Sequence, residues 1–521
     1  MDVVDYYNLN ERDQKAWELV CSGRTKGVFQ LDSNLGQSWA KRLQPIDIEE
    51  MSDLSALLRP GAMNSMMDDK SMTQHYVDRK FGIELDNPIH PSLFNVLKDT
   101  YQILVYQEQS MAIARELAGF TLEQADNLRK AIGKKSVEIM NKCEVEFLEG
   151  CRTAGVVDNE TASKIFNMIR ESQKYQFNKS HSVSYSKVGY WTAYMKANYN
   201  KVFLCASMNH LGSLEPKETL RALILEAKSY SVPVYPPSTK SQLNRFSLQG
   251  GAIYFGLTAI KDVGESGVLA LQKAVNDSGK KIEDFTWPEL LPLLSPVSIK
   301  TIEPLIGVGY FDFLNIPRIK LLEEYKVHCK FTGSITKQFD LVVANNPEIK
   351  SFVEILQRCV GIYDDCVKFE QKKPFNLNIY ARLKDIITLL KQSNIERDSV
   401  DWICRKEREL LGIELTYSKL DKCDAVASNT NCQKIRESGG ENLAFAAEIV
   451  SVREYTIKDG KNSGQVMAFV TLADQTGYLD CVIFSGLYST RKNMFYEGNT
   501  VFIHGKIGDK GSLIIEGLKE I

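Results

Sequence analysis

The sequence has little of several features that mark common protein classes. It contains no apolar run near the roughly 20 residues that a membrane helix needs, so an integral membrane protein is excluded. Lys plus Arg total 64 and Asp plus Glu total 66. The net charge of −2 excludes a globally basic nucleic-acid coat, although it does not exclude local basic patches. The first residues show no basic-then-apolar signal pattern, so we expect a cytoplasmic protein.

Cysteine and histidine are present, but not in metal-binding patterns. The 11 cysteines are scattered and form no C-x-x-C pair, so we expect reduced thiols in a chain without an export signal. The 6 histidines show no H-E-x-x-H spacing. His328 and Cys329 are adjacent, and neighbouring residues of a helix point apart, which disfavours a structural zinc site there. We expect no metal site.

The remaining composition is that of a multidomain globular protein. The chain has 521 residues, of which 44% are hydrophobic and 25% charged, which is enough for about three or four domains. Apolar residues at three- and four-residue intervals predict helices over 104–118, 122–132 and 219–229, and residues 346–432 are also expected to be helical.

After the flexible stretch Arg436–Gly440 the apolar period changes to two, which predicts short strands. The expected strands are Ala444 to Tyr455, Val466 to Leu472, Leu479 to Phe484, Thr500 to Lys506 and Ser512 to Gly517. Short strands with turns between them are typical of a small closed barrel. The sequence therefore predicts a multidomain, mainly α protein followed by a small all-β barrel.

The densest cationic stretch is Leu128–Lys135, with the sequence LRKAIGKK. Lys130 and Lys134 are four residues apart and share a helix face. We expect Gly133 to end the helix, so that the lysines after it can turn toward a ligand. These charges favour a local anion site in a neutral protein. The alternative is a solvated helix end whose cations satisfy the helix dipole.

A second cluster, Tyr175–Tyr185, has aromatic rings on both sides of Asn178, Lys179 and His181. Such a set can stack on bases while it contacts phosphate and sugar. A polar turn with ordinary core tyrosines is the alternative. Neither this cluster nor the cationic stretch is a specific signal when it stands alone.

Taken together and in order, these motifs resemble the C-family bacterial replicative DNA polymerases, which are the alpha subunits of DNA polymerase III. The resemblance extends over nearly the whole chain. The motifs that carry it are GVFQL at 27–31, LLRPG at 57–61, TYQILVYQEQ at 100–109, GFTLEQADNLRKAIGKK at 119–135, YQFNKSHSVSYS at 175–186 and YWTAYMKANY at 190–199. Gln102 and Gln176 depart from the family, which has glycine there, so the geometry of a turn near the pocket is left open.

The resemblance implies four domains. The expected parts are a polymerase fingers domain at 1–248, a helix-hairpin-helix and clamp-binding region at 249–345, a helical connector at 346–435 and an OB-fold nucleic-acid-binding domain at 436–521. The helix-hairpin-helix is implied by the stretch Tyr254–Gly267, whose glycines would let backbone N–H groups approach DNA phosphates.

The resemblance also implies site residues. Those for nucleotide and DNA binding are Arg59, Arg129, Lys130, Lys134, Lys135, Asn178, Lys179, Ser180 and His181. Those for the DNA backbone in the helix-hairpin-helix are Lys261, Gly264 and Gly267. Those for the sliding clamp are Gln338, Phe339, Asp340, Leu341 and Val342, with a buried amphipathic turn as the alternative. Those for single-stranded DNA on the barrel are Arg453, Tyr455, Lys461 and Phe469.

In this family the metal-binding carboxylates belong to a palm domain and lie partly in a P-D-x-D-x-D stretch, which the sequence does not contain. The nearest imitation is Asp47–Glu50, which matches an ordinary acidic segment of the family. We therefore expect no catalytic residue and no metal ligand in this chain. Mg²⁺ is expected for the assembled enzyme, with its ligands on the palm.

The leading interpretation is one half of a split DNA-directed DNA polymerase. This chain would bind primer-template DNA, the incoming dNTP and the sliding clamp, and a palm-bearing polypeptide would complete the enzyme in a bacterial or bacteriophage-infected cell. The alternative is a non-catalytic DNA- or clamp-binding relative that modulates a host polymerase. A fragment produced by a misassigned gene start or an intron is a third interpretation.

Overall fold

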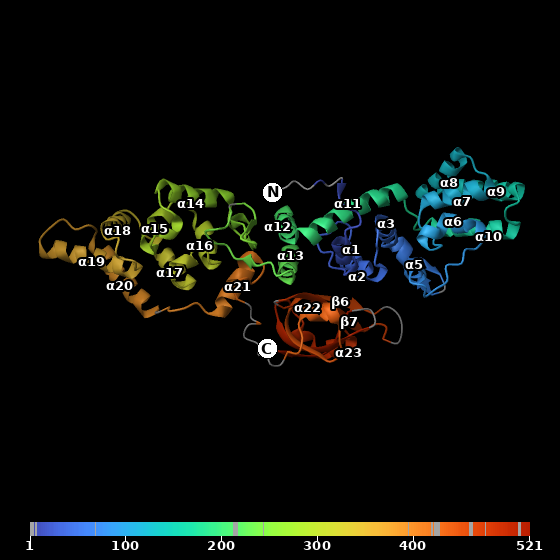
Figure 1. Cartoon of the computed structure of the whole chain (residues 1–521). Helices are drawn as coiled ribbons and strands as arrows, with labels where there is room; N and C mark the ends of the chain where they lie inside the picture. Colours follow the sequence, from blue (N-terminus) through green and yellow to red (C-terminus); the bar gives the residue numbers. More distant parts are fainter. Residues whose placement is uncertain are drawn as a thin grey trace. The chain divides into compact units, whose positions relative to one another are not determined.

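The computed structural model describes residues 5–521 apart from 6–7, 68, 212–216, 243, 394, 418–419, 421–427, 458–461, 475 and 509–511. The chain divides into two compact units, Met1–Phe203 and Leu204–Ile521. Figure 1 shows the elements coloured along the sequence. Within the described residues, no helix combines the length and the apolar character that crossing a membrane requires.

The first unit is almost entirely helical. Its α-helices are α1 (Gln14–Cys21), α2 (Asn34–Leu43), α3 (Ile48–Leu57), α4 (Pro60–Asn64), α5 (Met72–Lys80), α6 (Phe94–Leu97), α7 (Gln107–Ala118), α8 (Leu122–Lys134), α9 (Val137–Ala154), α10 (Asn159–Ser172) and α11 (Lys179–Asn198). A two-stranded ribbon of β1 (Met66–Met67) and β2 (Lys70–Ser71) precedes α5. The helices predicted over 104–118 and 122–132 are confirmed as α7 and α8.

Helices α6 to α10 enclose one hydrophobic core, which includes Leu117, Ile132, Phe147 and Phe166. In Figure 1 these helices form the cyan and teal group. Thr121 begins α8 by accepting a hydrogen bond from the Gln124 N–H, in a capping box. The cap and the apolar face together fix how α8 presents its cations.

Helix α11 is the long element that packs against α1 and α3. Gly189 lies at a close approach, because a Cβ there would lie 2.7 Å from Met51 Cε on α3 and 3.1 Å from the carbonyl oxygen of Phe29. The N-terminal half of α11 therefore lies against the buried face of α3.

The second unit begins within α12 (Asn200–His210) and continues with helices and a small sheet. Its α-helices before the barrel are α13 (Lys217–Ser229), α14 (Glu265–Asp277), α15 (Trp287–Leu294), α16 (Ile299–Gly307), α17 (Arg318–His328), α18 (Ser334–Asn345), α19 (Phe352–Lys368), α20 (Leu377–Ser393), α21 (Val400–Leu411) and α22 (Cys432–Ser438). The small sheet has the order β3 (Val234–Tyr235), β5 (Ala252–Tyr254), β4 (Ser247–Gln249). The predicted helix at 219–229 is confirmed as α13.

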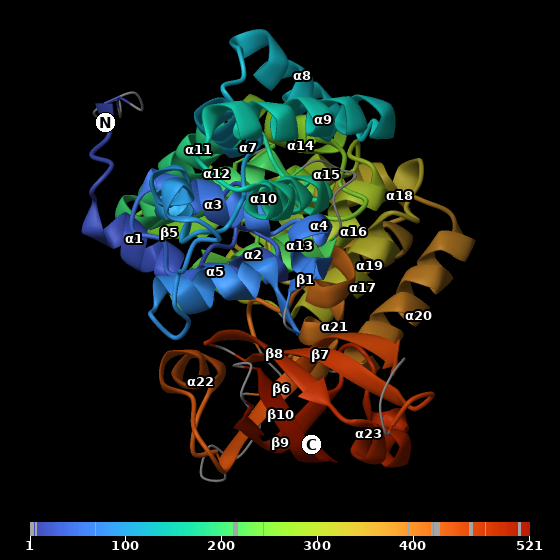
Figure 2. The same ribbon diagram turned by 90° about the vertical axis from the view of Figure 1, so that its right-hand side faces the viewer.

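The predicted barrel is confirmed. Its strands are β6 (Leu443–Thr456), β7 (Val466–Asp474), β8 (Gly477–Ile483), β9 (Thr500–Ile507) and β10 (Leu513–Glu520). They close in the order β10-β8-β7-β6-β9, with β10 parallel to β8 and the other pairs antiparallel. Helix α23 (Ser485–Arg491) lies between the third and fourth strands and packs against β7 (Figure 2). A five-stranded Greek-key barrel of this kind is an OB-fold.

Candidate nucleic-acid interface

A row of rings begins just before α11 and continues along its first half; Phe177 is half-buried, and His181 and Tyr185 are exposed. Phe177, His181 and Tyr185 are spaced four residues apart, so they follow one face as the helix begins. The ring centroids of Phe177 and His181 are 5.4 Å apart, and those of His181 and Tyr185 are 4.1 Å apart. Phe29 continues the row, with its ring 5.4 Å from that of Tyr185. We call Phe177, His181, Tyr185 and Phe29 the aromatic row.

Two cations lie at the Phe177 end of the aromatic row. The Arg59 guanidinium carbon lies 3.4 Å from the centroid of the Phe177 ring, and burial lowers the pKa of Arg59. The Lys179 Nζ lies 5.6 Å from the ring centroid of Tyr106. Aromatic faces beside cations can stack on bases and attract phosphate at the same time.

The start of α11 is held in place by α7. The Asn178 side chain caps α11 by accepting from the His181 N–H at 2.9 Å. Glu108 accepts from Asn178 Nδ2 at 2.9 Å and from the Lys179 N–H at 3.0 Å. Ser180 Oγ donates to Asn178 Oδ1 at 2.7 Å. The structure thus brings the predicted residues 178–181 together in one turn.

A buried carboxyl group lies beneath this turn. Asp53 on α3 accepts hydrogen bonds from the hydroxyls of Tyr106, at 2.6 Å, and Tyr76, at 2.7 Å. Burial raises the pKa of Asp53 to about 7, although both hydroxyls and Lys179 act in the opposite direction. Our sequence interpretation missed Asp53. The available signal was one acid among the apolar residues of the stretch 51–58.

The loop that presents Phe29 depends on a second residue that we missed. Lys196 on α11 is fully buried, and its ammonium donates to the carbonyl oxygens of Arg24 and Lys26 at 2.8 and 2.7 Å. The Phe29 N–H donates to Thr192 Oγ1 at 3.0 Å. The sequence alone could not show that Lys196 holds this loop, because only its burial indicates the role and residue type does not predict burial of a lysine.

The cationic end of α8 differs in detail from our expectation. Gly133 does not end the helix, because α8 runs to Lys134 and Lys135 takes the left-handed capping conformation with φ +52°. The carboxylate of Asp126 forms ion pairs with Arg129 and Lys130, both at 2.8 Å. Part of the predicted charge is therefore neutralised within the helix.

The cationic end of α8 lies near the start of α7. A Cβ at Gly133 would lie 3.8 Å from Gln107 Nε2. The Gln107 N–H donates to the carbonyl oxygen of Phe177 at 3.0 Å. Gln107 therefore connects the end of α8 to the first residue of the aromatic row.

The two departures from family glycines have different structural consequences. Gln102 keeps the backbone that a glycine would favour, with φ +58°, and its side chain donates to the Phe94 carbonyl oxygen at 3.3 Å. Gln176 is buried and donates to Ser110 Oγ at 2.7 Å and Ser172 Oγ at 2.6 Å. Both amide nitrogens are thus hydrogen-bonded, whereas both amide oxygens are buried without a partner among the described residues.

The predicted helix-hairpin-helix lies at the start of α14. Lys261 and Gly264 are exposed there. The Lys261 N–H donates to the Leu410 carbonyl oxygen at 2.9 Å. Gly267 serves packing, since a Cβ there would lie 2.1 Å from Thr301 Oγ1 on α16. A role of these residues in binding the DNA backbone stays a prediction.

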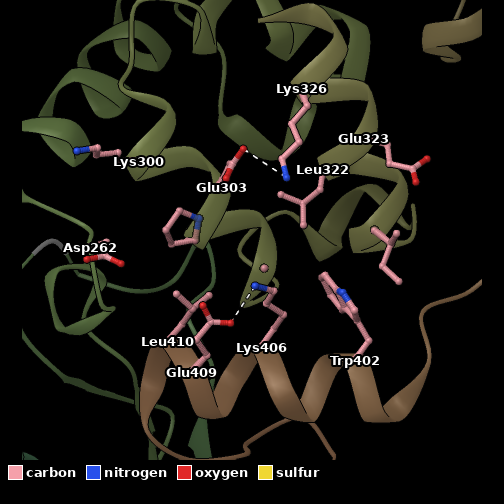
Figure 3. A pocket seen from close by; sticks show the side chains of 13 residues that line it. Asp262, Lys300, Glu303, Leu322, Glu323, Lys326, Trp402, Lys406, Glu409 and Leu410 are labelled. Carbon is pink, nitrogen blue, oxygen red and sulfur yellow. Dashed lines mark hydrogen bonds and ion pairs between the residues drawn. The ribbon is translucent and has the colours of Figure 1, made fainter. Parts of the chain in front are cut away.

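A cavity of about 580 Å³ lies beside this segment, between α16, α17 and α21 (Figure 3). Four of its charged side chains form ion pairs: Lys326 on α17 lies 3.7 Å from Glu303 on α16, and Lys406 lies 2.9 Å from Glu409 on the same helix, α21. Trp402 lines the apolar part. The lining carries charges of both signs, which gives it no clear preference for an anion or a cation.

The predicted clamp-binding peptide is part of α18. Phe339 and Val342 are buried, Gln338 and Asp340 are half-buried, and Leu341 is 57% exposed. The Phe339 ring lies 5.0 Å from the ring of His328 and 5.6 Å from that of Phe352. This arrangement favours the alternative of a buried amphipathic turn, and only one face is free to meet a clamp.

The barrel presents a smaller aromatic surface. Arg453 on β6 and Phe469 on β7 are register partners, and the guanidinium carbon lies 5.3 Å from the ring centroid. Tyr455 lies 6.1 Å from Phe469, and both rings are exposed. Lys461 lies outside the described residues.

The acidic segment Asp47–Glu50 has structural partners. Asp47 caps α3. Glu50 accepts hydrogen bonds from Lys80 Nζ at 2.7 Å and from the Tyr101 hydroxyl at 2.9 Å. Within the part of the chain that the structure describes, no group of three or more His, Cys, Asp or Glu residues is placed to hold a metal ion.

Comparisons with known proteins agree with this geometry. The family described as "Bacterial DNA polymerase III alpha subunit finger domain" matches residues 2–155. DNA polymerase III subunit alpha of Aquifex aeolicus is 30% identical over 96% of this chain and 38% of the relative. The subunits of Bacillus subtilis (30% identical) and Saccharopolyspora erythraea (29%) match over 96% and 98% of this chain, and 41% and 40% of their own lengths.

The chain spans about 40% of the length of these curated relatives. Its helical first unit contains the matched finger segment, and its last domain is an OB-fold. The chain therefore matches the C-terminal part of the alpha subunits of DNA polymerase III, which are the C-family bacterial replicative DNA polymerases.

Proposed function

We propose that this chain is the substrate-gripping component of a DNA-directed DNA polymerase. It binds primer-template DNA and the incoming dNTP through its first unit, and a palm domain on another polypeptide supplies the metal-binding carboxylates. The observation that carries the proposal is the aromatic row, with Arg59 and Lys179 at one end. A row of stacked rings beside cations fits bases and phosphates together.

The cations of the first unit have separate tasks in this proposal. Arg59, Lys179 and His181 face the nucleotide, and Asn178 and Ser180 fix the turn that presents them. The end of α8, with Arg129, Lys130, Lys134 and Lys135, meets triphosphate and template backbone. Lys134 and Lys135 carry no ion pair to a described carboxylate, whereas Arg129 and Lys130 share Asp126.

The palm is the part that the described residues do not supply. Nucleotide transfer uses two metal ions about 3.5–4 Å apart, held by clustered carboxylates. Asp53 does not fit this task, because it is buried between two tyrosine hydroxyls. Glu50 is occupied by Lys80 and Tyr101. Mg²⁺ therefore belongs to the palm, and no step of the chemistry falls to this chain.

The second unit would keep the assembly on DNA. Lys261, Gly264 and Gly267 are proposed to meet the duplex backbone, and Arg453, Tyr455 and Phe469 the single-stranded template. The sliding clamp would contact α18 through its exposed face, where Leu341 lies.

Replacing Lys134 and Lys135 by alanine is expected to weaken binding to primed DNA and to lower its salt dependence. Each lost phosphate contact reduces the slope of log affinity against log salt by about 0.9. Fluorescence anisotropy of a labelled primer-template measures this slope when NaCl is raised from about 50 to about 200 mM. The double variant Lys41→Ala with Lys98→Ala is the matched control, since both lysines are exposed and form no ion pair with a described carboxylate. An unchanged slope in the Lys134/Lys135 variant removes the α8 lysines from the site.

A further inference from the structure

Helices α19 and α20 form an antiparallel hairpin in the second unit, in the segment to which the sequence assigned no chemistry. Asn376 begins α20 by accepting from the Ile379 N–H at 3.0 Å. Tyr363 stacks on Phe375 at 5.3 Å and on Tyr380 at 4.4 Å. The stacked rings fix the conformation of the end of the hairpin, residues 366–384. We call residues 366–384 the hairpin tip.

Within its bounds the hairpin tip has more cations than acids, whereas Asp364, Asp365 and Asp385 flank it directly and the whole chain carries a net charge of −2. It has 5 cations, Lys368, Lys372, Lys373, Arg382 and Lys384, against the single acid Glu370. All of these cations are exposed. As far as the described residues go, none of them forms an ion pair with a carboxylate, in contrast to Arg129 and Lys130 on α8.

Aromatic contacts hold several of these lysines in defined positions. Lys373 Nζ lies 5.6 Å from the Tyr363 ring centroid, and Lys384 Nζ lies 4.7 Å from that of Tyr380. Lys368 Nζ lies 5.3 Å from the ring of Phe369, which is itself 61% exposed. A cation held in place by a ring loses less conformational freedom when it binds an anion.

We propose that the hairpin tip is an additional DNA-binding surface, which contacts the phosphates of double-stranded DNA through Lys368, Lys372 and Lys373. Lysine can contact a phosphate as a point charge, without the fixed bidentate geometry of arginine. The exposed Phe369 lies beside Lys368 and contacts the sugar edge of the groove. This surface does not include any residue named under the proposed function. The hairpin proposal rests on the proposed function only for the statement that the chain binds DNA.

The test uses the full chain with Lys368→Gln, Lys372→Gln and Lys373→Gln together. Binding to a labelled duplex without a primer end is followed by anisotropy at increasing salt. Each phosphate contact contributes about 0.9 to the slope of log affinity against log salt, so the loss of three contacts should lower the slope by about 2.7. When salt rises fourfold, the loss of affinity in the variant should therefore be about 40-fold smaller than in the unaltered chain. Because all three side chains are exposed, the melting temperature should not change.

The matched control replaces three exposed lysines elsewhere, Lys15→Gln, Lys41→Gln and Lys98→Gln, and should keep the original slope. The hairpin proposal alone is overturned if the hairpin variant keeps the salt slope of the unaltered chain while Lys134→Ala with Lys135→Ala lowers it. If both variants keep the salt slope of the unaltered chain, the proposed function is overturned as well. Lysine-dependent binding to phosphatidylserine vesicles with no lysine-dependent binding to duplex also overturns the hairpin proposal.

Discussion

Replacing Phe339 by alanine is expected to lower the free energy of unfolding of the α17–α19 segment by about 3–5 kcal/mol. The side chain is fully buried, and rings on three sides would face the cavity that its loss leaves. One of these neighbours, the His328 imidazole, is kept neutral in this core, because burial lowers its pKa to about 4. Amide hydrogen exchange of α18 and α19 measures this local stability.

Leu341→Ala is the matched control, since this residue is on the same helix and is exposed. It should leave the unfolding free energy of α18, measured by hydrogen exchange, within about 0.5 kcal/mol of that in the unaltered chain. If α18 contacts the clamp with its exposed face, the same change weakens clamp retention in a pull-down. A stability loss equal to that of Phe339→Ala would contradict the burial pattern of this helix.

Replacing Asp53 by asparagine is expected to remove a large pH dependence from the stability of the first unit. In the folded chain the pKa of Asp53 is raised to about 7, above the ordinary value of about 3.9. Between these values the folded state holds a proton that the unfolded state releases, so stability falls as pH rises. The stabilisation is complete below about pH 4 and is lost by about pH 7, at about 1.4 kcal/mol per pH unit.

The comparison is hydrogen exchange of α3 and α7 at several pH values between 4 and 8, after correction for the intrinsic exchange rate. The variant should show a flatter profile than the unaltered chain, because asparagine does not titrate. Asp86→Asn removes an exposed carboxyl group of the same unit and should keep the original slope. Parallel profiles for the unaltered chain and the Asp53 variant would show that Asp53 is ionised throughout.

The regular elements could be predicted because their signals are local. Thr121 caps α8 as its sequence pattern indicates, and the period of two after Gly440 predicted the barrel strands to within a few residues. The cluster at 178–181 was also local, since an N-cap and the turn after it bring these residues together.

What the sequence did not predict depends on contacts between distant segments. Asp53 is important because Tyr76 and Tyr106 converge on it, and Lys196 because the carbonyl groups of the loop at 24–26 meet its ammonium. The predicted end of α8 at Gly133 was wrong for a different reason. Gly133 has no close neighbour that requires a turn there, and Lys135 adopts the left-handed conformation that we expected glycine to take.

The substrate-gripping role and the external palm are tested most directly by primer extension with purified components. The chain alone, with primed template, dNTPs and Mg²⁺, should bind the primer end and add no nucleotide. Addition of a palm-bearing polypeptide of the same family should start extension, which Lys134→Ala with Lys135→Ala then reduces. Extension by the chain alone, or none with any palm-bearing polypeptide, would contradict the proposal, and the second result would favour a non-catalytic relative that only binds DNA or the clamp.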